Sequence, residues 1–428
     1  MEATDMPDPE NMTGADGEQY RRHPTPRSQA VSLLSVVVLL CASAGATPPA
    51  DTRLEARTLL TTYGDPSGYV TSPGGAYDGV VKLTVTGEEG SFLGSGSLIS
   101  DRYVLTAAHL LDLNDDGMAD VTPENTQVLF NLSTGTQTLT AVSRDIHSQY
   151  DPGSWWSNDI GIIELERAAP AAATRYEIYR GSGESGATVE LAGYGRSGTG
   201  DEGDVLSSGT KRAGLNQIDD INTFDGNGGD DIPDGTQLNM DFDNGLAAND
   251  AFDFFYDMPG LGLGEDEVFI APGDSGGPSF IGGQVAGVHS YGVRMSNRLG
   301  KPPRNSDING SLDASFGEFA SDTRVSAYQA WIDYYIAALP GDADRNGLVD
   351  LADFATLEGN WDPQGYGYGW ADGDFDADSA VGNADLAAVL SNWTAAPLAA
   401  SVPEPATLVT LTGGALVLLR SRRRHLSR

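Results

Sequence analysis

Polar and apolar residues alternate along residues 80–85, which is typical of a β-strand with one buried face. Short apolar runs at residues 96–105, 160–165 and 280–288 are bounded by glycine and polar residues and predict further strands. A later group of residues has helical spacing and consists of Val325, Tyr328, Trp331, Ile332 and Ile336. This spacing predicts a helix that packs on the preceding strands. The pattern therefore indicates a mainly β domain that ends with a helix.

The N-terminal part of the chain has the layout of a secretory signal peptide. Three arginines in residues 21–27 precede an apolar run over residues 30–44, and Ala-Gly-Ala follows at residues 44–46. A basic flank, a short apolar run and a small-residue exit are typical of such a signal, and the run is short for a membrane span. We therefore expect residues 1–46 to be a leader and signal peptide, and residues 47–75 to be a linker or propeptide.

The C-terminal end has three parts in series. Residues 402–405 read Val-Pro-Glu-Pro, residues 406–419 are apolar, and four arginines follow within residues 420–424. The series resembles the PEP-CTERM sorting signal of bacterial envelope proteins, which an exosortase recognises and cleaves. The resemblance implies that residues 402–428, with their short transmembrane helix, are removed and that the mature protein has no stable membrane span. Together with the signal peptide, it implies a protein that is secreted or lies in the cell envelope or on the outer surface of a bacterium.

Composition excludes two kinds of partner. The chain carries 61 acidic and 25 basic residues, which gives a net charge of −36 at pH 7. Such a charge repels nucleic acid and anionic lipid, so neither is expected as a partner. Aspartate and glycine are concentrated in residues 196–268, which are loop-like. A solvated insertion is the favoured interpretation of this segment, and specificity loops and metal sites are the alternatives.

Three segments carry candidate catalytic residues. Residues 273–278 read Gly-Asp-Ser-Gly-Gly-Pro, residues 105–109 read Leu-Thr-Ala-Ala-His, and residues 158–165 open with Asn-Asp before an apolar strand. A serine hydroxyl becomes a nucleophile only beside a base, and that base needs a third group to orient it. The serine segment taken alone would instead be a glycine-rich turn between strands. The three segments together favour nucleophilic catalysis.

The order histidine, aspartate, serine resembles the chymotrypsin/trypsin family of serine endopeptidases. The resemblance implies that His109 is the general base, that Asp159 orients it, and that Ser275 is the nucleophile. It also implies that the backbone N–H groups of Gly273 and Ser275 form the oxyanion hole. The implied fold is two six-stranded antiparallel β-barrels with a C-terminal helix, over residues 76–338.

The same resemblance identifies the residues of a specificity pocket. The residue six positions before the serine, which would lie at the base of the pocket, is Phe269. A trypsin-like acid is therefore absent, and cleavage after arginine or lysine is not expected. His289 occupies the place where glutamate-specific relatives carry a histidine. We expect Phe269, His289, Ser290 and Gly292 to belong to the pocket.

Residues 340–397 contain a repeat in which an acidic loop leads into a short apolar helix. Oxygen-bearing side chains recur at the positions that calcium-binding loops use. These candidate metal ligands are Asp342, Asp344, Asn346, Asp350, Asp353, Asp374, Asp376, Asp378 and Asp385. Because Ser379 replaces the glycine at position six of the second loop, we expect that loop to bind more weakly. The repeat resembles the type I dockerin family, which implies a small α-helical, EF-hand-type domain and a cohesin-like partner.

Burial alone makes a domain of this size marginally stable, so we expect it to fold only with calcium. Its expected core residues are Leu348, Val349, Leu351, Phe354, Leu357, Trp361, Val381, Leu386, Val389, Leu390 and Trp393.

A further acidic loop follows the histidine segment. Oxygen-bearing side chains occur at Asp112, Asn114, Asp116 and Asp120. Their spacing resembles a calcium loop, but the twelfth position is Pro123, which offers no carboxylate. A calcium site and a solvated turn are equal alternatives here.

The sequence thus predicts a secreted or envelope-associated serine endopeptidase that hydrolyses peptide bonds of proteins or peptides through an acyl-enzyme, with a calcium-stabilised dockerin-like module. The alternative is a catalytically silent, calcium-dependent surface binding or scaffold protein built on a protease fold. Labelling by a fluorophosphonate serine probe distinguishes the two.

Overall fold

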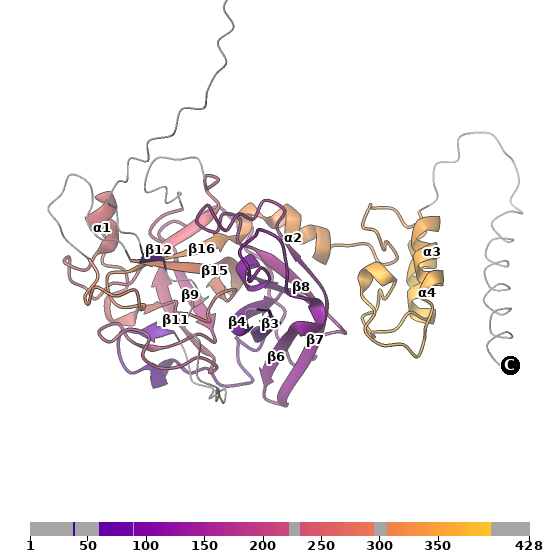
Figure 1. Cartoon of the computed structure of the whole chain (residues 1–428), viewed down its shortest axis with the longest axis horizontal. Helices are drawn as coiled ribbons and strands as arrows, with labels where there is room; N and C mark the ends of the chain where they lie inside the picture. The colour runs from indigo at the N-terminus through magenta and orange to yellow at the C-terminus, as the bar shows by residue number, and fades with distance from the viewer. Residues whose placement is uncertain (1–36, 39–59, 89, 222–231, 295–305, 395–428) are drawn as a thin grey trace, which may run out of the picture. The chain divides into compact units, whose positions relative to one another are not determined.

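The computed structural model describes residues 37–38, 60–88, 90–221, 232–294 and 306–394 (Figure 1). The predicted signal peptide, apart from residues 37–38, lies outside the described residues, and so does the predicted sorting signal. Among the helices of the described residues, none combines the length and the apolar character needed to cross a membrane.

The first half of the domain is a closed antiparallel barrel with the strand order β3-β4-β5-β8-β7-β6. Its strands are β3 (Val80–Gly87), β4 (Gly90–Leu98), β5 (Tyr103–Thr106), β6 (Thr126–Leu132), β7 (Gly135–Ile146) and β8 (Gly161–Leu165). The predicted alternation in β3 is confirmed, because Leu83 and Val85 are buried while Lys82 and Thr84 are half-buried. The inward side chains fill the barrel with branched and aromatic groups, which stabilise it by removing apolar surface from water.

The second half is an open sheet with the order β11-β9-β14-β15-β16-β12. Its strands are β9 (Thr188–Gly193), β11 (Arg212–Gln217), β12 (Gln237–Asp241), β14 (Pro278–Ile281), β15 (Gln284–Arg294) and β16 (Phe319–Arg324). The short strand β1 (Val37–Val38) also pairs with β15. The predicted mainly β, two-barrel fold is thus confirmed as one closed barrel and one half-barrel, which Figure 1 shows as two neighbouring groups of strands.

Residues 60–75 contribute to the folded domain, which corrects their prediction as linker or propeptide. The strand β2 (Thr61–Thr62) lies between β10 (Gly198–Thr199) and β13 (Val268–Phe269) in a three-stranded sheet. Leu60 is fully buried in the core of the second half. A segment with these contacts cannot leave without exposing that core.

Part of the predicted solvated insertion is also packed. Strands β11 and β12 lie within it, and so does the helix α1 (Ala251–Tyr256). Phe252 and Phe255 of α1 are buried against Phe319 of β16. The many aspartates and glycines between β11, β12 and α1 made these three elements hard to recognise in the sequence. The interpretation as a solvated insertion is wrong for them.

The predicted C-terminal helix is confirmed as α2 (Gln329–Ile336). Tyr328 and Ile332 are buried in the core between the two halves, and Trp331 and Ile336 pack against it. The short 3₁₀ helices are η1 (Pro66–Tyr69), η2 (Ala108–Leu110), η3 (Pro123–Asn125), η4 (Gly264–Asp266), η5 (Val325–Ala327) and η6 (Trp370–Asp372).

The C-terminal module contains the two helices α3 (Leu351–Gly359) and α4 (Asn383–Ser391), which pack together. Its buried core consists of Ala343, Val349, Leu357, Trp370, Phe375, Val381 and Val389. Phe354, Trp361 and Leu386 are partly buried against this core. Four residues that were expected inside are exposed instead, namely Leu348, Leu351, Leu390 and Trp393. The core instead includes Trp370, which lies between the two repeats, and Phe375 of the second loop.

Candidate active site

Two paired strands of the closed barrel bring His109 next to Asp159. Thr106 at the end of β5 pairs with Gly161 at the start of β8. The histidine follows β5 and the aspartate precedes β8, so both residues lie at one edge of the barrel. The Nδ1 atom of His109 lies 2.7 Å from Oδ2 of Asp159, and the His109 backbone N–H donates to Oδ1 at 2.9 Å. The carboxylate therefore holds one ring nitrogen, and the other, Nε2, is the one available to act as a base.

Asp159 is also bonded to the second half of the domain. Its side chain is fully buried, and the Ser290 hydroxyl of β15 donates to its carboxylate. The Thr323 hydroxyl of β16 donates to its backbone carbonyl at 2.7 Å. These bonds fix the aspartate, and through it the histidine, relative to both halves.

The protonation of His109 reflects this neighbour. Burial lowers the pKa of the imidazole, but the charge and hydrogen bond of Asp159 raise it, and the nearby Asp115 and Asp112 add to the effect. The net pKa of His109 lies above its usual value. The surroundings thus favour the imidazolium, the form that a histidine reaches after it accepts a proton from a nucleophile.

Ser275 lies in a tight turn before β14. Gly273 and Gly276 flank it with φ angles of +99° and +80°, which side chains rarely adopt. A Cβ atom on Gly276 would lie 2.1 Å from Oγ1 of Thr106. The turn therefore packs directly against the end of the strand that leads to His109, and only glycine fits there.

Further contacts hold Ser275 between the two halves. Its backbone carbonyl accepts the N–H of Ser95 from β4 at 2.8 Å. The serine lines a pocket together with Ser290, the residue whose hydroxyl binds Asp159. The three candidate catalytic residues are thus gathered in one region, where the barrel meets the sheet.

Asp274, next to Ser275, stabilises the turn through hydrogen bonds to its carboxylate. Its carboxylate is fully buried and accepts the backbone N–H groups of Gly195 at 2.7 Å and Ala271 at 3.0 Å. Burial raises its pKa to about 6, against the lowering effect of His289 and of these hydrogen bonds. No ion pair between described residues includes Asp274, so backbone donors hold the turn.

The backbone N–H of Gly273 is the first candidate donor of the oxyanion hole. Within the described residues, the Gly273 N–H donates to no protein acceptor. A backbone N–H in a tight glycine turn with this freedom can bind a developing oxyanion.

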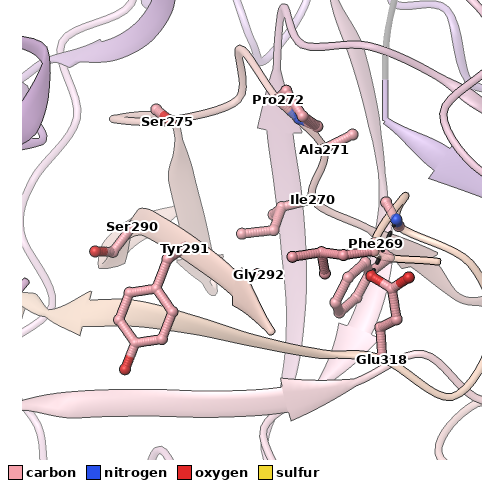
Figure 2. Close-up of a pocket in the computed structure, with 11 residues that line it drawn as sticks. Phe269, Ile270, Ala271, Pro272, Ser275, Ser290, Tyr291, Gly292 and Glu318 are labelled. Carbon is pink, nitrogen blue, oxygen red and sulfur yellow. Dashed lines mark hydrogen bonds between the residues drawn. The ribbon is translucent and has the colours of Figure 1, made fainter. Parts of the chain in front are cut away.

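The pocket beside Ser275 is mostly apolar (Figure 2). Of the four predicted pocket residues, Phe269, Ser290 and Gly292 line it. Sequence reasoning missed Glu318, whose carboxylate lies next to Phe269 in the pocket wall. This carboxylate is fully buried, burial raises its pKa well above the usual value, and it accepts hydrogen bonds from its own loop, including the Ala314 N–H at 3.0 Å.

His289, in contrast, does not line the pocket, which corrects its expected position. It is fully buried, and its Nδ1 lies 3.0 Å from Oδ1 of Asp322. The Ser279 hydroxyl donates to the other oxygen of the same carboxylate. Asp322 thus forms a second histidine–aspartate pair inside the sheet half, which no sequence motif indicated.

The predicted calcium loops of the C-terminal module share one hydrogen-bond pattern. In the first loop, the Asp342 carboxylate accepts the N–H groups of Asn346 and Gly347 at 3.1 and 2.8 Å. In the second, the Asp374 carboxylate accepts those of Asp378 and Ser379 at 3.2 and 3.1 Å. The loops are therefore curled around their carboxylates, as an oxygen-ligated cation requires.

Not all predicted ligands gather equally. One carboxylate oxygen from each of Asp342, Asp344 and Asp353 lies within 4.8 Å of the others, and the same holds for Asp374, Asp376 and Asp378. Asp350 instead caps α3 by accepting the Ala352 N–H, while Asp385 accepts backbone N–H groups of its own loop. Asn346 bonds within the first loop.

Asp374 has an additional partner. Its carboxylate forms a buried ion pair with Arg102, with 3.0 Å between Nη2 and Oδ2. A cation in the second loop would compete with this guanidinium.

The loop over residues 112–120 has the same local pattern. The Asp112 carboxylate accepts the N–H groups of Asp116 and Gly117, and Asn114 and Asp120 also accept backbone donors. No three of its acids form a close carboxylate group among the described residues. Its geometry therefore fits a hydrogen-bonded turn as well as a calcium loop.

Part of the chain is similar to known proteins. The trypsin family model matches residues 67–228, which include His109 and Asp159 and end before Ser275. A solved structure of HL collagenase is similar over 62% of this chain and 95% of that chain, with 17% identity and a TM-score of 0.41. No curated protein matches the chain. The family match over residues 67–228 and the barrel topology support a trypsin-like fold.

Proposed function

We propose that the chain is a serine endopeptidase that uses His109, Asp159 and Ser275. The observation that carries the proposal is the 2.7 Å pair between His109 and the fully buried Asp159. Ser290 connects this pair to the pocket that Ser275 lines. A base oriented by a buried acid, beside a serine in a glycine turn, is the arrangement that nucleophilic acyl transfer requires.

In the proposed reaction, Nε2 of His109 accepts the proton of the Ser275 hydroxyl while the oxygen attacks the carbonyl carbon of the peptide bond. The negative charge of the tetrahedral intermediate is stabilised by the N–H groups of Gly273 and Ser275. His109 then gives its proton to the leaving amine, and the acyl-enzyme forms. Water, deprotonated by the same histidine, attacks the ester and releases the acid product and Ser275. Asp159 stabilises the imidazolium in both halves of the reaction.

A fluorophosphonate probe tests the proposal directly. An activated serine displaces fluoride from the phosphorus and forms a stable ester, whereas an ordinary serine does not react. We expect labelling of Ser275 alone, identified by peptide mass spectrometry. A folded protein that takes up no label would favour the silent scaffold alternative.

The pocket predicts a preference for apolar side chains before the cleaved bond. Phe269, Ile270 and Tyr291 are among the residues that line it, and the Glu318 carboxylate already accepts donors from its own loop. We expect peptides with an apolar residue to be cut about 10²-fold better than those with arginine or lysine, because an unpaired buried cation costs several kcal/mol. A peptide library provides the measurement.

Glu318→Gln is the control for that preference. The variant should keep the apolar profile, because the substitution changes only a carboxyl group with a raised pKa. A wild-type profile dominated by basic residues, lost in Glu318→Gln, would show that the glutamate and not the apolar wall selects the substrate.

We propose that the C-terminal module binds calcium and depends on it for folding. The residues fit the ion, because two groups of three carboxylates converge in loops curled by backbone hydrogen bonds. Calcium would neutralise the repulsion within each group. The first loop has Gly347 at φ +86°, whereas the second has Ser379 at +75°, where a side chain is strained.

The isolated segment 340–397 is therefore expected to be unfolded in chelator and to become helical with calcium, followed by circular dichroism. Asp342→Ala should raise the calcium midpoint more than Asp374→Ala, because it damages the less strained loop. A helical spectrum in chelator that does not respond to calcium would contradict the prediction.

We also propose export and sorting of the protein, with an exosortase-type enzyme and a cohesin-like protein as partners. Support comes from the sequence of residues 1–46 and 402–428 and from the paired loop–helix units of the module.

A further inference from the structure

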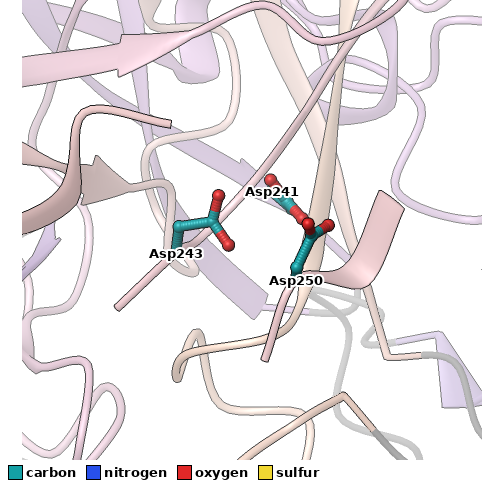
Figure 3. Close-up of side chains that lie close together, drawn as sticks. All are labelled: Asp241, Asp243 and Asp250. Atoms are coloured by element: carbon teal, nitrogen blue, oxygen red, sulfur yellow. The ribbon is translucent and has the colours of Figure 1, made fainter. Parts of the chain in front are cut away.

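Three aspartates converge inside the half-barrel, away from the predicted calcium loops. Asp241 ends β12, Asp243 follows two residues later, and Asp250 precedes α1. All three are buried, and one carboxylate oxygen from each lies within 4.8 Å of the others. In Figure 3, the Asp243 carboxylate is turned toward those of Asp241 and Asp250. We call these three residues the buried aspartate cluster.

Asp243 is the residue of the cluster that lacks a partner. Its exposed fraction is 0%, and neither of its carboxylate oxygens has a hydrogen bond. Its backbone N–H donates to Glu267 at 2.7 Å, which adds a fourth buried carboxylate to the surroundings. A buried carboxylate with both oxygens unsatisfied is costly and calls for a proton or a cation.

No side-chain cation of the described residues fills this role. None of the ion pairs between described residues includes Asp241, Asp243, Asp250 or Glu267. Burial, followed by the neighbouring acids, raises the pKa of Asp243 to about 9, and burial raises that of Glu267 to about 7. Both pKa values are raised because several buried carboxylates lie close together without a positive charge of the described residues beside them.

The other two aspartates are already oriented as ligands. Oδ2 of Asp241 accepts the N–H groups of Ala251 and Phe252 at 2.8 and 3.2 Å. The Asp250 oxygens accept the N–H groups of Asp253 and Gly260 at 2.7 and 3.1 Å. Each Asp250 oxygen keeps a lone pair for an ion, because a carboxylate has about four acceptor sites.

We propose that Asp241, Asp243 and Asp250 bind one divalent cation, with calcium as the best fit. Calcium takes oxygen ligands at about 2.3–2.6 Å, so two ligands on opposite sides of it are about 4.8 Å apart. The separations within the cluster do not exceed this span. Asp243 supplies the unsatisfied oxygens, and the ion replaces the missing positive charge.

The position of the cluster connects it to the candidate substrate pocket. Phe242, between two of the ligands, stacks on Phe269 with 5.5 Å between ring centroids and an interplanar angle of 4°. Phe269 lines the pocket beside Ser275. A cation that fixes Asp241 and Asp243 would also fix this pair of rings, and so the wall of the pocket. This consequence for catalysis rests on the proposed function, whereas the binding of the ion does not.

Calcium binding is tested in the full chain carrying Asp342→Asn and Asp374→Asn, which weaken the C-terminal loops. After chelation, calorimetric titration with calcium gives the stoichiometry, and thermal unfolding gives the stabilisation. Adding Asp243→Asn should remove one equivalent of calcium and reduce the calcium-induced rise in Tm. Asp253→Asn is the matched control, because it removes one negative charge from α1 but no ligand of the cluster, and it should leave the calcium stoichiometry unchanged.

Without metal, Asp243→Asn is expected to change Tm in the opposite direction. In chelator, Asp243→Asn should raise Tm, because it removes an unsatisfied buried carboxylate from the cluster. Equal stoichiometry and equal thermal shift in Asp243→Asn and its parent would overturn the proposal and leave protonated carboxyl groups as the occupants.

A second measurement covers the case in which Asp243→Asn does not fold. Hydrogen–deuterium exchange of the parent chain, with calcium and in chelator, should show slower exchange for residues 241–256 with calcium, because the N–H groups of Ala251 and Phe252 bind a ligating carboxylate. Unchanged exchange there at saturating calcium would overturn the proposal. Failure of Ser275 to react with a fluorophosphonate would refute the peptidase without affecting either result.

Discussion

Ser275→Ala is expected to lower the hydrolysis of casein by about 10⁶-fold, the order of loss seen when a serine nucleophile is removed from a triad enzyme. Without the hydroxyl no acyl-enzyme can form, and neither His109 nor the oxyanion donors can compensate. Stability should change little, because the substitution removes one oxygen from a turn that Gly273, Asp274 and Gly276 hold. Initial rates and thermal unfolding of the same preparation measure both effects.

The control for this prediction is Ser133→Ala, at an exposed position in the turn between β6 and β7. It should retain full activity. Casein hydrolysis at the wild-type rate by Ser275→Ala would mean that another group, or a contaminating protease, carries the activity. A fluorophosphonate label that persists on the variant would show that another of its own serines is that group.

Each part of the candidate active site lies in a short segment that has its own sequence signal. His109 and Asp159 flank strands whose apolar pattern is evident, and Ser275 lies in a glycine turn whose backbone angles exclude most other residues. The pairing of β5 with β8 then brings distant segments together without further information. Local sequence patterns are sufficient to predict that two residues lie close together where backbone pairing of strands, and not a side-chain contact, brings them together.

Contacts between side chains that are distant in sequence could not be predicted in this way. His289 was expected in the pocket from its place beside Ser290, but Asp322 from β16 binds it inside the sheet. Glu318, which lines the pocket, directly precedes the same strand, β16. Both positions depend on how β15 and β16 are aligned, and a shift of register there, between His289 and Tyr291, is not visible in the sequence.

The acidic middle of the chain was the largest misinterpretation, for a related reason. High local charge usually indicates solvation, so residues 196–268 were interpreted as a solvated insertion. In the structure, Asp241 ends β12, Asp250 caps the start of α1, and Asp243 lies between these elements, and all three are buried. Composition reports the average environment of a residue type, and these aspartates depart from that average.

The other large effect is expected for Asp159→Asn. The Asp159 carboxylate accepts the His109 ring, the His109 backbone N–H and the Ser290 hydroxyl. An amide side chain cannot accept all three, and it favours the ring tautomer in which Nε2 carries the proton and cannot act as a base. We expect kcat/KM to fall by about 10⁴-fold while the fold is retained. Peptide hydrolysis and circular dichroism measure the two quantities.

The pH profile separates this role from a merely structural one. Protonated His109 cannot accept the Ser275 proton, so the activity of the wild type should fall as the pH drops through the raised pKa of His109, above its usual value of 6.5. Burial alone lowers this pKa, and the charge of Asp159 raises it. Asp159→Asn should therefore shift the acidic limb of kcat/KM to lower pH, in addition to reducing its height. The matched control is Asp322→Asn, the same change in the second histidine–aspartate pair, which should lower Tm and leave the limb where it is. A limb that stays in place in Asp159→Asn would mean that His109 is not the group whose protonation controls the reaction.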